Sequence, residues 1–176
     1  MILTTAPGQG LLFFSFLYRR DLFEKDLFLN RTQNFFGKLI TFSPIHNPLI
    51  NYYAKEMGDA SLLDRHFFLT TTAFPREFLL TTKLLAIDWE REWRHNQARQ
   101  VNVDIGFLSL ENFILATTKN YSHRVFLGQN IFADLTYQAV DGRFQTLPWT
   151  YPDYIDQEKI DFFNWSRSFL LMQSKL

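Results

Sequence analysis

The segment 117–124, with the sequence TTKNYSHR, concentrates side chains that bind anions. It contains the ammonium group of Lys119, the imidazole of His123 and the guanidinium of Arg124. These groups hold phosphate or carboxylate through charge-assisted hydrogen bonds, and an arginine can do so bidentately. An imidazole with its ordinary pKa of about 6.5 also suits acid–base chemistry near neutral pH. We therefore expect an anion site at Lys119, His123 and Arg124, with His123 as the candidate catalytic residue.

The same three residues also have a purely structural interpretation. Lys119 near the C-terminus of a helix is favoured by the helix dipole by about 0.3–1 kcal/mol without any ligand. His123 can hydrogen-bond a neighbouring carbonyl group, and Arg124 can be one partner of a structural ion pair. Because neighbouring residues of a strand point to opposite faces, His123 and Arg124 reach one cleft together only if His123 belongs to the preceding loop.

Other segments carry side chains that could border such a site. In 51–58 (NYYAKEMG), residues four apart share a helix face, which pairs Tyr52 with Glu56; core packing is the alternative role for this turn. The segment 149–154 (WTYPDY) is held extended by Pro148 and Pro152, and serves either as a lid over a planar ligand or as a strap across the core. Besides Lys119 and Arg124, the candidate ligand-binding residues are Tyr53, Glu56, Asp104, Asp134, Trp149, Tyr151 and Asp153.

Hydrophobic periodicity and turn residues predict the elements that carry these side chains. Strands are expected at 11–18, 38–42, 65–71 and 100–104, helices at 21–36 and 75–93, and a short helical turn at 51–57. The order β-α-β-β-α-β is that of the ferredoxin-like split motif. We therefore predict an α+β fold whose four strands form one antiparallel sheet with two helices on one face.

A second unit is predicted after this ferredoxin-like core. It consists of a helix capped by Ser109 that ends near residue 119, an antiparallel β-meander with strands at 124–127, 131–140 and 143–147, and a C-terminal helix at 157–172. The pair Asp141-Gly142 is a strong signal for a two-residue hairpin turn between the last two strands.

The helix that begins at Pro75 has apolar residues at steps of three and four. They form a stripe one helix face wide, made of Phe78, Thr82, Leu85, Ala86, Trp89 and Trp93. We expect this stripe to face the core, so that both Trp89 and Trp93 are buried. The opposite side, which includes Lys83 and Glu90, is expected to be solvated.

Length and composition exclude several classes of protein. The 176 residues suit one hydrophobic core, so a single domain over 1–176 is expected. The 18 basic and 18 acidic residues cancel, which disfavours a large face for duplex nucleic acid. With no cysteine there are no disulfides, thiolate metal sites or cysteine nucleophiles, and a reducing, cytoplasmic location is expected. Every apolar run is shorter than the roughly 20 residues of a membrane span, so no membrane partner is expected.

Signatures of common nucleotide and hydrolase sites are absent. The sequence has no Gly-rich phosphate loop, no dinucleotide fingerprint and no nucleophile elbow. The four histidines lie far apart, and no spacing indicates a metal ligand or a particular cofactor. The 20 Phe, 7 Tyr and 4 Trp suit an aromatic core, and any excess would form a partner surface, so a homo-oligomer is compatible with the composition.

Four segments carry a family resemblance: YYAKEMG at 52–58, VNVDIGFLSL at 101–110, LATTKNYSHR at 115–124 and LPWTYPDY at 147–154. Through them most of the chain resembles an uncharacterised bacterial family, domain-of-unknown-function family 4416, some members of which are labelled GTP-binding proteins. The sequence departs from the family pattern at 104–107, where DIGF replaces Asp-Pro-Gly-Tyr, and at 132–134, where FAD replaces Tyr-Ala-Glu. Neither a phosphate loop nor an N-K-x-D motif supports the GTP label.

Two functions of different classes follow from these patterns. The first is binding, with or without turnover, of a small anionic ligand that bears a phosphate or is nucleotide-like. In it the cations of 119–124 hold the anion, Asp104 or Asp134 supplies a carboxylate, and Trp149 or Tyr151 covers the ligand. The second is a non-catalytic interaction or self-association module with an aromatic surface. A cleft on which the cations converge favours the first, and a flat aromatic patch favours the second.

Overall fold

A computed structural model of the chain describes residues 8–95 and 98–174. The helices in this part of the chain are α1 (Lys25–Phe36), α2 (Ile50–Met57), α3 (Phe78–Glu92) and α4 (Gln157–Gln173), with short 3-10 turns η1 (Ala60–Leu62) and η2 (Pro152–Tyr154). The strands are β1 (Leu11–Arg19), β2 (Leu39–Phe42), β3 (Leu63–Thr70), β4 (Val101–Leu108), β5 (Asn112–Thr117), β6 (Arg124–Gly128), β7 (Ile131–Val140) and β8 (Arg143–Thr146).

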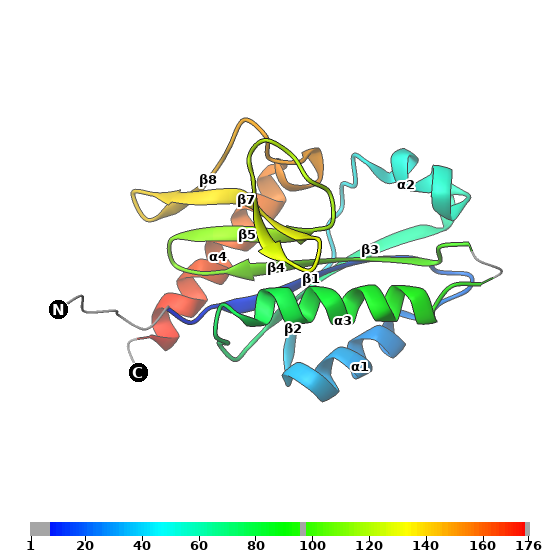
Figure 1. The fold of residues 1–176 in the computed structure, drawn as a ribbon, viewed down its shortest axis with the longest axis horizontal. Helices are drawn as coiled ribbons and strands as arrows, with labels where there is room; N and C mark the ends of the chain where they lie inside the picture. The colour runs from blue at the N-terminus through cyan, green and yellow to red at the C-terminus, as the bar shows by residue number, and fades with distance from the viewer. Residues whose placement is uncertain (1–7, 96–97, 175–176) are drawn as a thin grey trace.

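All of these strands belong to one antiparallel sheet (Figure 1). Its order is β2-β3-β1-β4-β5-β7-β6, and β8 pairs with β7 outside this path. The α+β class expected from the sequence is confirmed, and the first four predicted strands lie side by side in the order β2-β3-β1-β4. No helix within the described residues is long and apolar enough to cross a membrane.

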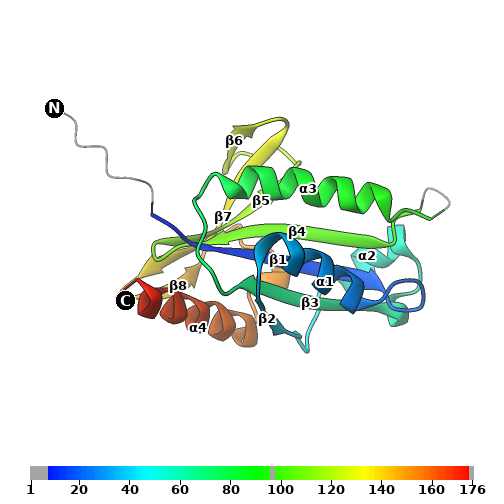
Figure 2. The ribbon, with the colours of Figure 1, turned by 90° about the horizontal axis from the view of Figure 1, so that it is seen from below.

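Helices cover both faces of this sheet, and Figure 2 shows α3 and α4 on opposite sides. Phe14 and Phe16 of β1 pack with α1 and α3, whereas the alternating residues Leu11 and Phe13 pack with α4. A strand buried on both faces has apolar residues at nearly every position, which explains the uninterrupted run at the start of β1. The aromatic content therefore serves mainly to fill two cores, one on each face.

The helix predicted from Ser109 is wrong, because residues 112–117 form the strand β5. The hydroxyl group of Ser109 accepts hydrogen bonds from the backbone N–H groups of Glu111 and Asn112, at 3.3 and 3.2 Å, and so closes a tight turn between β4 and β5. The two strands lie close together beyond this turn. A Cβ atom on Gly106 would lie 2.5 Å from the ring of Phe113, so a larger residue does not fit there. A serine hydroxyl accepts backbone N–H groups at the start of a helix, and in this protein it does so in a hairpin turn.

The apolar stripe of α3 is partly as predicted. Trp89 is buried and Trp93 is partly buried, and the two rings lie 5.9 Å apart. Phe78, at the first turn, is 38% exposed instead of facing the core. The expectation of a solvated opposite side is wrong for Lys83, which is only 7% exposed. Lys83 is buried because its ammonium group hydrogen-bonds the backbone of the neighbouring strand β4.

Candidate functional site

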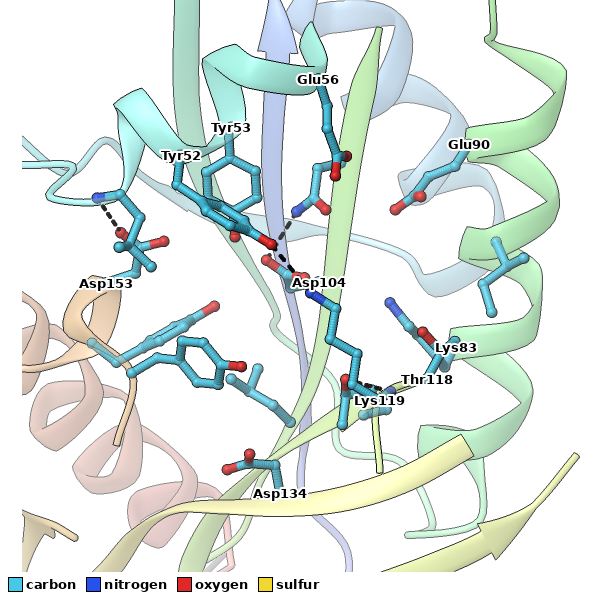
Figure 3. Close-up of a pocket in the computed structure, with 18 of the residues that line it drawn as sticks. Tyr52, Tyr53, Glu56, Lys83, Glu90, Asp104, Thr118, Lys119, Asp134 and Asp153 are labelled. Atoms are coloured by element: carbon cyan, nitrogen blue, oxygen red, sulfur yellow. Dashed lines mark hydrogen bonds between the residues drawn. The ribbon is translucent and has the colours of Figure 1, made fainter. Parts of the chain in front are cut away.

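The sheet opens along half of β4. Strand β1 pairs with β4 over the whole of 101–108, but β5 pairs only with 105–108 and then diverges. A cavity of about 510 Å³ lies at this opening, bordered by α2, α3, η2 and the residues that follow β5 (Figure 3). This volume falls in the range of about 300–1,000 Å³ that is typical of small-molecule sites.

Side chains replace the missing strand along this open edge. The ammonium group of Lys83 donates to the carbonyl oxygen of Val103 at 3.0 Å, and the N–H of Val103 donates to a carboxylate oxygen of Glu90 at 2.6 Å. Arg99 donates to the carbonyl oxygen of Val101 at 3.1 Å and to the other oxygen of Glu90 at 3.0 Å. Burial raises the pKa of Glu90, against the lowering effect of Arg99 and Lys83. Lys83 and Glu90 are therefore committed to the backbone of β4.

A buried ion pair fastens the segment that closes one side of the cavity. Arg65 of β3 donates to Asp153 of η2 at 2.6 Å, and both side chains are buried. The second oxygen of Asp153 accepts the N–H of Leu49, just before α2, at 3.2 Å. Asp153, a predicted ligand-binding residue, therefore holds β3, α2 and η2 together and places Tyr53 and Tyr154 beside the cavity. Arg65 itself was missed by sequence reasoning, although a single arginine inside an apolar strand signals the need for a buried acid.

Lys119 is the exposed one among the described cations that line the cavity. Its side chain is exposed, and its ammonium group lies 3.5 Å from the hydroxyl oxygen of Tyr52. Figure 3 shows Lys119 and Tyr52 reaching from opposite sides toward Asp104, in the middle of the opening. Glu56, one turn further along α2, interacts with Arg99 at 3.4 Å. The two ends of the predicted site, α2 and the loop after β5, thus face each other.

Arg124 and His123 both bind Asp134. Arg124 donates to Asp134 at 2.8 Å, to the carbonyl oxygen of Lys119 at 2.8 Å and to the hydroxyl of Tyr151 at 3.1 Å. His123 lies 3.3 Å from the same carboxylate oxygen. The two side chains reach one acid because His123 precedes the first residue of β6 and belongs to the turn. Arg124 thus has the structural role that the sequence left open, and it fixes the backbone at Lys119.

His123 and Trp149 lie outside the lining of the cavity. Their rings stack on each other with centroids 5.0 Å apart, and the indole N–H of Trp149 donates to the carbonyl oxygen of Leu135 at 2.7 Å. The remaining predicted residues do line the cavity: Tyr53, Glu56, Asp104, Lys119, Arg124, Asp134, Tyr151 and Asp153. Sequence reasoning missed other lining residues, among them Tyr154, Asn102, Lys83 and Glu90.

The inner part of the cavity is polar and includes the carboxylate of Asp104. Asp104 is partly buried, and one of its oxygens accepts from the amide group of Asn102 at 3.0 Å. Burial and then the negative charge of Asp104 raise the pKa of Tyr53 and of Tyr154, so both phenols stay protonated at neutral pH. Within the described part of the chain, no group of three His, Asp or Glu side chains is arranged to hold a metal ion.

Comparisons with known proteins identify a family but no characterised relative. A search of the curated proteins and a search of the solved structures find no match to this chain. The family model described as Domain of unknown function (DUF4416) matches residues 9–169, which is nearly the whole chain, and the protein therefore belongs to this family.

Proposed function

We propose that the protein binds a small phosphate-bearing ligand, of the size of a sugar phosphate or a nucleotide, in the cavity beside β4. The observation that carries the proposal is the state of Lys119. Lys83, Arg99 and Arg124 also border the cavity, but each donates to backbone or carboxylate oxygens of the protein. Among the residues that the structure describes, the ammonium group of Lys119 has only the hydroxyl of Tyr52 within hydrogen-bond reach. It is therefore an exposed cation with donors left for an anion.

The other lining residues have complementary roles in this proposal. Tyr52, Tyr53 and Tyr151 supply aromatic surface against which a sugar or base packs. Asp104 and Asp134 would disfavour an anion in the inner part of the cavity, which leaves the phosphate at the outer end beside Lys119. Arg124 contributes indirectly, through its hydrogen bond to the backbone of Lys119. His123 is separated from the cavity lining, so the proposal is binding and assigns it no proton transfer.

Thermal-shift measurements test the proposal with defined probes: inorganic phosphate, ribose 5-phosphate, AMP and GTP. A probe at 100 times its Kd stabilises the folded protein by about 2.7 kcal/mol. Lys119→Ala should weaken binding of the same probe about tenfold or more, since a hydrogen bond to a charged group contributes about 1.5–3 kcal/mol.

The matched control for this test is Lys38→Ala, which removes an exposed lysine that does not line the cavity. It should bind the probe as the wild type does. The proposal is wrong if Lys119→Ala and Lys38→Ala have equal affinity, or if none of the four probes raises the melting temperature of the wild type.

Strand β6 favours a second candidate function, self-association. It is the last strand of the sheet path, and its residues Val125 and Phe126 are 65% and 60% exposed. An edge strand with apolar side chains and no free charge can pair with another strand. Sedimentation velocity over a range of protein concentrations separates this candidate from a monomeric ligand-binding protein.

A further inference from the structure

Tyr154 has a hydroxyl group without a partner at the inner end of the cavity. Among the residues that the structure describes, no group lies in hydrogen-bond geometry with this oxygen, although the residue is 3% exposed. The ring cannot turn away, because it stacks on Phe67 with centroids 5.9 Å apart and contacts Phe13 and Phe163. Buried hydroxyl groups are normally paired, so a fixed and unpaired one that lines a cavity indicates a partner that enters the cavity.

Asp104 offers the matching acceptor in the same cavity. One of its oxygens is engaged by Asn102, and the other accepts no hydrogen bond from any described residue. Ser15 lies directly opposite Asp104 in the register of β1 and β4, and its buried hydroxyl is also unpaired. Ser15 is not among the residues that line the cavity, so the inner end combines a carboxylate oxygen with the unpaired hydroxyl group of Tyr154.

This combination fits neutral hydroxyl groups better than an anion. A second negative group next to Asp104 would be repelled, whereas a sugar hydroxyl donates to the carboxylate and accepts from a phenol. The phenols remain donors, since burial and Asp104 raise their pKa values. Carboxylates accept hydrogen bonds from ribose hydroxyl groups in the same way in dinucleotide sites of other folds.

We infer that Asp104 and Tyr154 form a hydroxyl-recognition subsite, and that the ligand is a phosphorylated sugar or nucleoside rather than phosphate alone. The inference rests on the proposed function, in which the phosphate binds at Lys119. The ligand would lie with its phosphate at the outer end of the cavity and its hydroxyl groups at the inner end, between α2 and η2.

Isothermal titration calorimetry with three probes tests the subsite. Ribose 5-phosphate carries phosphate and hydroxyl groups, inorganic phosphate lacks the hydroxyl groups, and O-phosphoethanolamine replaces them with an ammonium group. Wild-type protein should bind ribose 5-phosphate at least about tenfold more tightly than inorganic phosphate, and Tyr154→Phe should remove this difference without weakening inorganic phosphate. Asp104→Asn should also weaken ribose 5-phosphate.

The outcomes separate the subsite from the function on which it rests. If Lys119→Ala loses inorganic phosphate while Tyr154→Phe binds ribose 5-phosphate like the wild type, the anion site stands and the subsite is wrong. Tighter binding of O-phosphoethanolamine than of ribose 5-phosphate also overturns it, because Asp104 would then pair with an ammonium group.

A readout without any ligand uses a matched pair of tyrosines. Tyr137 is buried like Tyr154, but its hydroxyl donates to the carbonyl oxygen of Tyr154. Tyr137→Phe should lower the melting temperature by about 2–4 °C or more, whereas Tyr154→Phe should leave it unchanged or raise it by up to about 2–4 °C. Equal losses in the two variants would show that the Tyr154 hydroxyl is already satisfied, by ordered water only, and would overturn the inference.

Discussion

The two halves of β4 satisfy the same backbone requirement in different ways. Residues 105–108 lie between β1 and β5 and are hydrogen-bonded by strands on both sides. Residues 101–104 have β1 on one side only, and Lys83, Glu90 and Arg99 bind the backbone on the other. A long side chain reaches a backbone group from further away than a neighbouring strand does. The side-chain solution therefore leaves space, and the cavity occupies that space.

Residue types along β4 follow this difference. In the paired half Gly106 gives Phe113 room to approach, and Leu108 on the same face is buried. In the open half Asn102 and Asp104 point to the same face as Gly106, but toward the cavity. Breaking the sheet on one side of a strand thus converts buried apolar positions into positions for polar side chains. The following variants test this comparison.

The largest effect is expected for Arg65→Met, which breaks the ion pair that fastens α2 and η2 beside the open half. Asp153 would keep a buried charge without its partner, and such losses are about 3–5 kcal/mol. Urea denaturation measures the change in the free energy of unfolding. Adding Asp153→Asn removes the uncompensated charge and should restore part of the loss, whereas a double variant that is less stable than Arg65→Met would contradict this account.

A smaller loss is expected for Lys83→Met, which keeps the length of the side chain but removes the donor to Val103. The carbonyl oxygen of Val103 would lose its partner, at a cost of about 1–3 kcal/mol. The comparison variant on the paired half is Ile105→Val, expected to lose about 0.5–1.5 kcal/mol through a small cavity. If Lys83→Met is as stable as the wild type, water hydrogen-bonds the carbonyl oxygen of Val103 as well as the lysine does.

The smallest effect is a pH dependence at His66, which lies opposite Phe16 on the face of the sheet covered by α1 and α3. Its imidazole packs near Tyr18 and lies 2.7 Å from the hydroxyl of Ser43, and burial lowers its pKa below the usual 6.5, although Asp64 acts in the opposite direction. Because the unfolded chain binds this proton more readily, stability should fall as the pH decreases from 6.5 through the lowered pKa, and should not change with this group above 6.5.

Unfolding midpoints of wild type and His66→Gln between pH 5 and pH 8 measure this dependence. The variant should lack the part of the slope that lies below the usual pKa of histidine. Parallel curves for the two proteins would assign the slope to other groups.

Local signals were sufficient for most of the fold. A nearly continuous apolar run located β1, and Gly37, with a φ angle of 77°, marks the end of α1 as its sequence position suggests. Ser109 was misread because a serine that caps a helix and one that closes a hairpin accept the same backbone N–H groups. The choice between them is made by Gly106 and Phe113 on the paired strands, which is not local information.

Candidate residues of the cavity were found where residue type alone suggested a role, as for Lys119, Asp104 and Tyr53. Residues whose roles depend on a distant partner were not found. Arg65 needs Asp153, and Lys83 needs the free carbonyl of Val103, which exists only because β5 ends its pairing early. Arg124 was noticed for its charge, but its partner Asp134 lies opposite on β7, where only the register of β6 and β7 brings it.

The place of β1 in the sheet has a consequence for how the chain is made. This strand lies in the interior of the sheet, yet it precedes both of its neighbours, β3 and β4, in the sequence. During synthesis its apolar side chains, which are buried on both faces in the finished protein, lack a strand on either side until β3 has left the ribosome, and lack one on the second side until β4, which ends at Leu108, has followed. Exposed apolar segments of this kind promote aggregation and are the surfaces that chaperones bind. Substitutions that slow the pairing of β1 with β4 should therefore lower the yield of folded protein in cells more than they lower its stability once folded.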